Sequence, residues 1–585
     1  MKKLLLIAAV LLYVSTNAQF FQRNYGIPND HDQLTHGFNT NVLGFGHFMV
    51  GNSLTSSGTM PLTAVRTDVN GAPFFAPNFA NNYLIDDGSF NLLAGRARSF
   101  EIPGATGFGI VVEVSGNTNG LAYLNLDPMG NPTFIALHAP TTAGQTALIA
   151  HVVVNDLTNM DAIVVGTIID NNFTIAQEYP FAYSFDIATG TINWSTYYDH
   201  ATGFTPAINV RAHDCALLPA SGWLGVVGKS TAPGFTIGDD GFYMLLDITT
   251  GGWLGPSLIY DWGFNEDLKA IHFSTATGLF ATCGNFDFFG QRDVLTMLII
   301  PPPAPPVWGT VMQYNNTLGN PTNVEPSDIY TRTSVTPPGM AEFYVAGTAT
   351  DGNMLRTDAM VYKLDVNLNP VGQFTYGNPF PGVGVDLDGY DGTGSDGLST
   401  FANLTPTAMS TNMDFHHVKS YFNGQSGCNE DLQLPILQLI PPPLFIPVPT
   451  NPIPNVIAVG GSLNVTPTPF PTVVPMCFNT SIPGGSNAKV APLEEKADRE
   501  AKMSPNPVPQ GASALLLEVN TEVPVDVEVA IYDMLGKQYY SGMQHLSSGD
   551  NRLPINISGI NMAQGTYIVK ITGIDFNKNL TLLVK

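Results

Sequence analysis

The chain has 585 residues, of which only 12% are charged, and its formal net charge is −24. A chain this acidic lacks a broad basic face, which argues against binding nucleic acid or anionic lipid. Its 58 Gly, 45 Pro and 10% aromatic residues are typical of short strands joined by turns, and an apolar fraction of 44% is too high for general disorder.

Residues 1–18 have the pattern of a signal peptide. Lys2 and Lys3 precede an apolar run, and small residues follow as far as Ala18. We expect cleavage before Gln19. The apolar run is too short for a permanent membrane helix and no later stretch qualifies, so we expect an exported chain without a transmembrane helix.

A repeat of about sixty residues fills the chain from residue 19 to residue 424. Each copy has an apolar strand that ends in glycine, then an apolar strand closed by an Asp turn, then an aromatic strand. In the turn at Asp127, for example, Gly130 accepts the positive φ angle that the turn requires. The glycines that end the first of these strands are Gly51, Gly116, Gly166, Gly228, Gly284 and Gly347.

Four strands per repeat predict the blades of a β-propeller, because neighbouring blades bury the two sheet faces that one blade leaves exposed. The pattern resembles the sixty-residue repeats of secreted Bacteroidota proteins, whose copies end in an aromatic strand and Tyr-Gly. Residues 20–26 match such a last strand and residues 383–424 supply inner strands. We therefore expect these two segments to complete a seventh blade; seven blades are favoured over six, and an open β-solenoid or β-sandwich array is the alternative fold.

Residues 425–483 are rich in Pro and Thr, with short apolar runs that predict strands. Export permits disulfides, and a bond between Cys428 and Cys477 would stiffen a segment that has little core. Cys215 and Cys283 fall in neighbouring repeats and are the second candidate pair. None of the four cysteines forms a CxxC motif, so we expect no zinc site.

Residues 484–502 predict a charged linker that is easily cut, and residues 503–585 predict a small Ig-like β-sandwich. This last segment closely resembles the type A C-terminal sorting domain of the Bacteroidota type IX secretion system. The motifs that carry the resemblance are a Pro-Asn-Pro turn, an Asp-to-Gly turn, a Gly-Thr-Tyr strand entry and a C-terminal lysine, at Pro505, Asn506, Pro507, Asp533, Gly536, Gly565, Tyr567 and Lys585.

The resemblance implies partners and a destination. It implies passage through the periplasm, translocation across the outer membrane by the type IX machinery, and removal of the domain by a processing sortase. The mature protein would then be released or attached to surface polysaccharide, and so be secreted or held at the outer-membrane surface. The alternative is an Ig-like accessory module without a sorting role.

One acidic stretch suggests a cofactor. Four aspartates spaced by glycines predict a flexible loop of hard oxygen ligands, which Ca²⁺ prefers, although the spacing is not that of an EF-hand. The alternative is a solvated acidic turn. The four residues are Asp386, Asp388, Asp391 and Asp396.

No catalytic motif is recognisable: residues 222–230 resemble a phosphate-binding loop with the wrong spacing, and no nucleophile elbow occurs. We expect a non-enzymatic binding or adhesion scaffold that takes a glycan or protein ligand at the axial face of the propeller. The alternative is an extracellular polysaccharide- or protein-degrading hydrolase or lyase. It would be favoured if one pocket gathered three or more of Asp32, His36, Asp214, Asp240 and Asp261.

Overall fold

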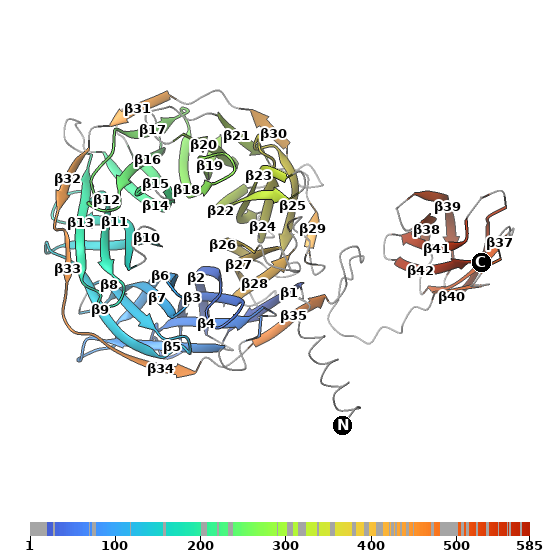
Figure 1. Ribbon diagram of the computed structural model, residues 1–585, viewed down its shortest axis with the longest axis horizontal. Coiled ribbons are helices and arrows are strands. Elements are labelled where there is room, and N and C mark those ends of the chain that lie inside the picture. Colours follow the sequence, from blue (N-terminus) through green and yellow to red (C-terminus); the bar gives the residue numbers. More distant parts are fainter. Residues whose placement is uncertain are drawn as a thin grey trace. The chain divides into compact units, whose positions relative to one another are not determined.

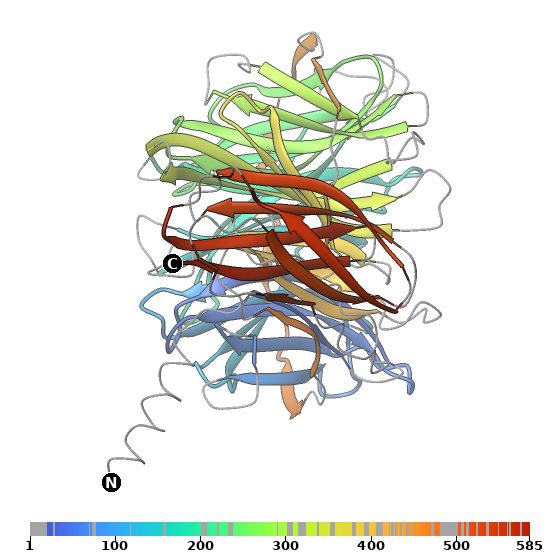
Figure 2. The ribbon, with the colours of Figure 1, turned by 90° about the vertical axis from the view of Figure 1, so that its right-hand side faces the viewer.

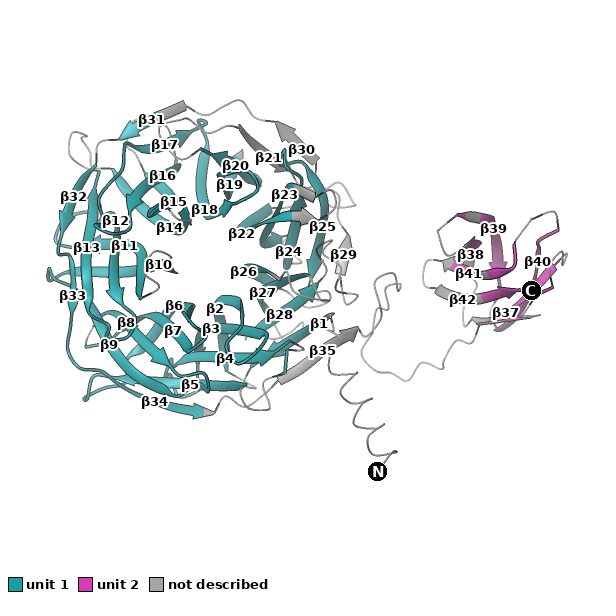
Figure 3. Cartoon of the chain, in the orientation of Figure 1, with its two compact units in different colours: residues 1–487 teal, residues 488–585 magenta. Residues whose placement is uncertain are grey.

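The chain forms two compact units, residues 1–487 and residues 488–585 (Figure 3). This computed structural model describes residues 20–479 and 501–585 apart from short stretches. Within the described part, no helix is long and apolar enough to cross a membrane. The longest of the stretches left out are 201–207, 232–237, 301–307, 314–322, 351–356, 391–396 and 405–412.

The first unit is a β-propeller of seven blades around a central axis (Figure 1). Four antiparallel strands follow one another outwards in each blade. The strands of blades one to four are β2 (His31–Thr40), β3 (Gly46–Leu54), β4 (Leu62–Asp68), β5 (Phe79–Asp86), β6 (Leu93–Ile102), β7 (Gly107–Ser115), β8 (Gly120–Leu126), β9 (Pro132–Pro140), β10 (Gln145–Val154), β11 (Asp161–Asp170), β12 (Gln177–Asp186), β13 (Ile192–Asp199), β14 (Asn209–Leu218), β15 (Trp223–Thr231), β16 (Asp240–Asp247) and β17 (Ser257–Asp261).

The last three blades complete the ring. Their strands are β18 (Asn265–Ser274), β19 (Leu279–Phe288), β20 (Gln291–Ile299), β21 (Trp308–Gln313), β22 (Asn323–Val335), β23 (Pro338–Thr350), β24 (Thr357–Leu364), β25 (Pro370–Tyr376), β26 (Gly382–Tyr390), β27 (Gly397–Leu404), β28 (Asp414–Ser420) and β1 (Phe20–Tyr25). Strand β1 pairs with β28, with Tyr25 opposite Phe415. The N-terminal strand therefore completes the seventh blade, as the repeat predicted.

The glycine of each repeat makes room for an irregular inner strand. A β-bulge interrupts β2 between Leu34 and His36, and a Cβ atom on Gly51 would lie 2.0 Å from the Gln33 carbonyl oxygen. Gly228 faces the carbonyl oxygen of Arg211 in the same way, at 1.9 Å. A side chain at these positions would push the bulge away.

The second blade departs from the predicted repeat. Val112 pairs with Ala97 at the place that glycine holds in the first blade, and Gly116 lies beyond the end of β7. The inner strand of this blade skips two residues, Gly95 and Arg96, instead of one. We infer that the wider irregularity leaves space for the valine side chain.

Tyrosines of the outermost strands join three of the blades to the next one. The Tyr25 hydroxyl donates to the Gly71 carbonyl oxygen at 2.8 Å, and Tyr198 donates to Gly251 at 2.8 Å. The acceptors are the glycines of the Asp turns, where Gly71 has φ of 71°. The two halves of the repeat motif, Tyr-Gly and the Asp turn, thus meet across a blade junction.

Each of the seven blade junctions holds a separate hydrophobic cluster. Between the first and second blades, for example, Phe48 stacks on Phe108 with ring centroids 4.0 Å apart. Between the seventh and first blades, Phe401 and Phe415 pack with Leu34. The apolar core is therefore a ring of interfaces, which is why no single blade is stable alone.

The Pro-rich segment runs once around the outside of the propeller and adds a fifth strand to every blade. We call residues 430–479 the belt; Figure 1 shows its strands in orange around the ring. It meets the blades in descending order, from the sixth to the first and then the seventh. Its strands are β29 (Glu430–Leu432), β30 (Ile436–Leu439), β31 (Leu444–Val448), β32 (Asn451–Pro454), β33 (Ile457–Val459), β34 (Asn464–Pro469) and β35 (Val473–Asn479).

The belt is attached by both backbone and side chains. The prolines of its described strands lie at sheet edges, where a missing N–H costs no ladder bond if it faces outwards. They are Pro447, Pro452, Pro454, Pro467, Pro469 and Pro475. Val448, Ile457 and Leu463 are buried in three different junction clusters. The sequence predicted strands in this segment but not that they would pair with the ring.

The belt returns to the place where it begins. Gln22 on β1 donates its side-chain amide to the Ser426 hydroxyl at 3.2 Å, and it pairs in the ladder with Cys477. Cys428 and the side chain of Cys477 lie outside the described residues, so the predicted bond between them stays a prediction.

The predicted pair Cys215–Cys283 is wrong. Both cysteines are free thiols, because each points into a different junction cluster: Cys215 packs between the third and fourth blades and Cys283 between the fifth and sixth. Burial raises the pKa of both thiols well above the ordinary value, so both stay protonated and unreactive.

The second unit is a small β-sandwich, whose strands are red in Figure 2. One sheet has the order β36-β37-β40 and the other β39-β38-β41-β42, as predicted for an Ig-like domain. Its strands are β36 (Ala501–Ser504), β37 (Ala514–Thr521), β38 (Val525–Asp533), β39 (Gln538–Leu546), β40 (Gly549–Asn556), β41 (Gly565–Gly573) and β42 (Phe576–Val584).

The motif residues of this unit lie at its strand ends. Gly565 begins β41, and the buried Tyr567 donates its hydroxyl to the Ala563 carbonyl oxygen at 2.9 Å. Lys585 donates its backbone N–H to the Val508 carbonyl oxygen at 3.0 Å, which ties the C-terminus to the sandwich. Pro505, Asn506, Pro507 and Gly536 lie outside the described residues, as does the side chain of Asp533.

Candidate functional site: the propeller axis

The seven inner strands bring one residue each to a common level on the propeller axis. All seven carry a register irregularity, and one residue shortly after it pairs with the same position of the second strand in every blade. This residue comes directly after the irregularity in six blades and one residue later, at Arg98, in the second blade. We call these seven residues the axial ring. They are His36, Arg98, His151, Asp214, Ala270, Asp328 and Asp386.

The titratable members of the axial ring contact one another across blades. His36 Nε2 lies 3.4 Å from Asp386 Oδ2, and His151 Nδ1 lies 3.2 Å from Asp214 Oδ1. The His36 and His151 rings meet edge to face with centroids 5.7 Å apart. Because each residue comes from a different blade, only the closed ring assembles this cluster.

The aspartates also fasten neighbouring inner strands together. Asp214 accepts the backbone N–H of Ile271 at 2.8 Å, and Asp328 accepts that of Leu387 at 2.8 Å. Asp386 accepts that of Gly37 at 3.1 Å. In each case the donor follows the axial-ring position of the next blade, so these carboxylates have a structural role whatever else they do.

Arg98 links the inner strand of the second blade to those of the first and third blades. Its Nε donates to the Ala150 carbonyl oxygen at 2.8 Å, and its Nη1 donates to the Thr35 carbonyl oxygen. Both acceptors belong to bulges of flanking blades. The guanidinium thereby satisfies backbone oxygens that the bulges remove from the sheet ladders.

Burial sets the charges of the axial ring. It lowers the pKa of His36 to about 4 and raises that of Asp214 to about 7. Burial and the Asp386 carboxylate raise the pKa of Asp328, while Asp386, although burial alone would raise its pKa, is held below its ordinary value by His36, Asp328 and Arg98. With a pKa this low, the His36 imidazole is uncharged at neutral pH.

Two cavities adjoin the axial ring. One, of about 720 Å³, is lined by charged residues of several blades: Arg96, Arg98, His213, Lys269 and Glu325. His213 and Lys269 both contact Asp267, at 2.8 Å and 2.6 Å. An ionic network therefore lines part of this cavity.

The other cavity, of about 550 Å³, has the axial ring as its polar wall. His36, His151, Asp214, Asp328 and Asp386 all line it. Aromatic rings face the same space and are half-buried: Phe38, His272, Phe273 and Tyr330. We call this space the axial cavity.

The structure separates the five residues considered for hydrolysis. His36 and Asp214 share the axial cavity, whereas Asp240 and Asp261 meet elsewhere, beside Glu266. Asp32 lies near Asp414, which burial and the Asp32 charge give a pKa raised to about 7. No cavity of the described residues therefore gathers three of the five.

The acidic stretch from Asp386 is partly strand rather than flexible loop. Asp386 and Asp388 lie on β26, the innermost strand of the seventh blade, and the Asp388 carboxylate accepts the Asn39 N–H at 2.7 Å. Asp391 and Asp396 lie outside the described residues. Calcium binding by these four aspartates stays a prediction.

Three members of the site were missed from sequence. His151 and Asp328 were not singled out, and Asp386 was taken for a loop residue. The signal was the spacing after the repeat's inner-strand bulge, which places all three at the level of His36. Bulges shift the face on which side chains lie, so the bulge position must be known before the facing of these residues can be predicted.

Comparisons with known proteins bear chiefly on the second unit. Residues 502–585 match the family described as a secretion system C-terminal sorting domain. This confirms the resemblance to a type IX secretion substrate, and the chain is therefore secreted or displayed at the cell surface. No curated protein matches the chain in sequence.

Two solved structures are similar over most of this chain. One is a glycoside hydrolase family 43 arabinoxylan arabinofuranohydrolase from Bacillus subtilis, with 10% identity, 94% of both chains covered and a TM-score of 0.23. The other is dimeric latent PorU from Porphyromonas gingivalis, with 11% identity, 95% of this chain and 34% of that chain covered, and a TM-score of 0.13. At such scores we base nothing on either likeness.

Proposed function

We propose that this exported propeller binds a carbohydrate in the axial cavity and acts as a non-enzymatic binding scaffold at the cell surface or in the medium. The main observation behind this proposal is that one cavity combines a polar wall of carboxylates and imidazoles with half-buried aromatic rings. A volume of about 550 Å³ lies in the range of small-ligand sites, 300–1,000 Å³.

The two kinds of wall suit the two faces of a sugar. Hydroxyl groups both donate and accept hydrogen bonds, and the axial ring offers acceptors such as Asp386 beside the neutral imidazole of His36, which does both. The C–H face of a pyranose is apolar and packs on aromatic rings, for which Tyr330 and Phe273 are placed. A charged cavity without rings would favour an ion instead.

One observation favours hydrolysis as the second candidate function. Burial and the Asp386 carboxylate raise the pKa of Asp328, whereas His36, Asp328 and Arg98 lower that of Asp386, and pairs of carboxyl groups whose pKa values are driven apart are typical of acid–base catalysis. Both carboxylates, however, are engaged by backbone N–H groups of the next blade. These hydrogen bonds favour a structural role, in which the carboxylates connect neighbouring blades, over catalysis on a substrate.

The experiment uses the full mature chain on a glycan array, followed by titration calorimetry and an assay for released reducing ends. Tyr330→Ala should weaken binding about tenfold or more by removing an aromatic wall. Tyr197→Ala is the matched control, because Tyr197 is also half-buried but stacks on Tyr179 of its own blade, at 5.0 Å. Binding without product supports the scaffold, product release supports the hydrolase, and no binding to any glycan refutes the proposal.

We further propose the route that the sorting domain implies: passage through the periplasm, removal of residues 503–585 by a processing sortase, and release or attachment to surface polysaccharide. The family match supports export. Intact mass measurement of the protein from medium and from washed cells tests the rest. A mature form that retains the domain would refute removal.

A further inference from the structure

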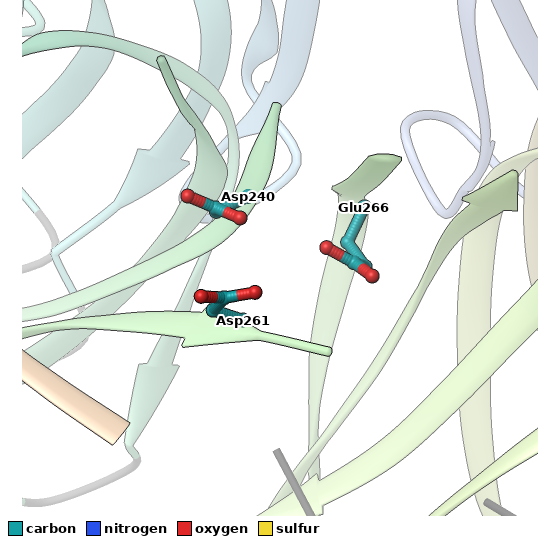
Figure 4. A group of neighbouring side chains, drawn as sticks. All are labelled: Asp240, Asp261 and Glu266. Carbon is teal, nitrogen blue, oxygen red and sulfur yellow. The ribbon is translucent and has the colours of Figure 1, made fainter. Parts of the chain in front are cut away.

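Three carboxylates from two blades meet at the junction of the fourth and fifth blades (Figure 4). Asp240 begins β16, Asp261 ends β17, and Glu266 is the second residue of β18. One oxygen of each lies within 4.8 Å of the others. Asp240 and Glu266 are fully buried and Asp261 is 7% exposed.

The backbone fixes this meeting. Strands β16 and β17 are antiparallel, with Gly241 opposite Tyr260, so the start of one and the end of the other share an edge. A short turn then leads into β18, and the Glu266 N–H donates to the Asp239 carbonyl oxygen at 2.7 Å. The three carboxylates therefore converge because of the sheet register, not because they attract one another.

Glu266 leaves one oxygen unsatisfied. Its Oε1 accepts the Phe264 N–H at 3.2 Å, but Oε2 is buried and has no hydrogen-bond partner. Figure 4 shows the Glu266 carboxylate facing the two aspartates. Burial of a carboxylate oxygen without a partner is strongly unfavourable, and a group that binds this oxygen would remove the penalty.

The basic side chain next to the group is engaged elsewhere. Lys229 lies opposite Gly241, which follows Asp240 in the chain, but its Nζ pairs with Asp239 at 2.6 Å. Asp239 is not one of the three acids.

The repeat supplies an internal comparison at the junction of the seventh and first blades. Asp414 and Asp32 hold the positions of Asp240 and Glu266, and Gly26 replaces Asp261. A Cβ atom on Gly26 would lie 2.2 Å from Asp414 Oδ1 and 3.1 Å from Asp32 Oδ2. The third position thus faces the other two carboxylates. At the third-to-fourth junction Asp199 holds the position of Asp261, but Tyr179 and Val210 stand in place of the other two acids. Among the described residues, only the fourth-to-fifth junction has all three acids.

We propose that Asp240, Asp261 and Glu266 bind a calcium ion that joins the fourth and fifth blades. All three ligands are hard carboxylate oxygens, with no thiol or imidazole, and Ca²⁺ is bound by such oxygens at about 2.3–2.6 Å. Two oxygens bound to one ion are then at most about twice that distance apart, and the three carboxylate oxygens lie within 4.8 Å of one another. Mg²⁺ requires a tighter octahedron and fits less well.

The test uses the full mature chain freed of metal by a chelator. Tb³⁺ replaces Ca²⁺ in such sites, and Trp262, next to Asp261 in the sequence, is placed to sensitise its luminescence. We expect saturable luminescence that Ca²⁺ displaces, and thermal unfolding at a higher temperature with Ca²⁺ than with chelator. Absence of both effects at millimolar ion would overturn the proposal.

Two variants and one control locate the site. Glu266→Gln keeps the side-chain volume, and Asp261→Gly copies the residue at position 26; each should weaken Tb³⁺ and Ca²⁺ binding at least tenfold. Asp414→Asn, which removes an acid from the two-carboxylate junction, should leave affinity unchanged. Unaltered binding in both variants, or loss of binding in Asp391→Asn instead, would assign the ion to another place and refute the proposal.

A reversal of stability separates a metal site from a merely structural cluster. In chelator, Glu266→Gln should unfold at a higher temperature than the wild type, because it removes one of three acidic groups that are buried together. In millimolar Ca²⁺ the order should invert, because only the wild type binds the ion. An unchanged order in the two buffers counts against calcium.

Discussion

The contribution of the inter-blade tyrosine hydrogen bond to the free energy of unfolding can be measured by removing single hydroxyl groups. In Tyr198→Phe the hydroxyl that donates to the Gly251 carbonyl oxygen at 2.8 Å is lost. Both groups are buried, so water cannot replace the donor. Leaving a buried carbonyl without its partner costs about 1–3 kcal/mol of the free energy of unfolding.

Tyr243→Phe is the matched control. Tyr243 is 1% exposed and lies in the next blade, but its hydroxyl oxygen has no hydrogen-bond partner. Removing this hydroxyl leaves nothing unsatisfied and ends the burial of an unpaired polar group. The free energy of unfolding should therefore stay the same or rise.

Equilibrium urea unfolding measures the two variants against the wild type. With an m value of about 4 kcal/mol per M, scaled up from small domains by size, a loss of about 2 kcal/mol lowers the midpoint by about 0.5 M. The Tyr243→Phe midpoint should be equal to or above that of the wild type. Equal losses in both variants would mean that ring packing, not the hydroxyl bond, joins the blades.

Three further predictions concern the belt, the buried acids and export. If Cys428 and Cys477 are bonded, thiol titration of the denatured, unreduced chain should find two thiols among the four cysteines, and four would exclude the bond. The pKa of Asp414 is raised to about 7, so its stabilising contribution is present at acid pH and lost as the pH rises through 7. Between pH 5 and pH 8 the wild type should lose about 2–3 kcal/mol more than Asp414→Asn, and parallel pH curves in thermal unfolding would contradict this. Deletion of residues 502–585 should leave the protein inside the cell, and normal surface labelling would refute the sorting role.

The blade repeat was predictable because its signals are local. Each copy has a glycine-ended strand, an Asp turn and an aromatic strand, and the structure explains all three. Gly51 accommodates a bulge, and Gly71 accepts the hydroxyl of Tyr25 from the preceding blade. The same reasoning placed the N-terminal strand in the seventh blade.

The belt and the site depend on contacts that lie far apart in sequence. Belt strands are as short as three residues and have no alternating pattern, so nothing local shows that they pair with the ring. Likewise Asp240 and Asp261 could be suspected from sequence, but Glu266 joins them only through the register of the next blade. His151 and Asp328 needed the bulge positions to be known in all seven inner strands.

The belt determines which strands detach first when the protein is under mechanical load. The sorting domain follows the belt in the chain, so tension applied at the C-terminus reaches β35 before any blade. The seven belt strands are of three to seven residues, and each can be peeled from its blade a few hydrogen bonds at a time. Peeling proceeds blade by blade while the four inner strands of every blade and the junction clusters remain intact. Under load, a cell-surface protein of this design would lose its belt strands first, and its axial cavity would stay intact.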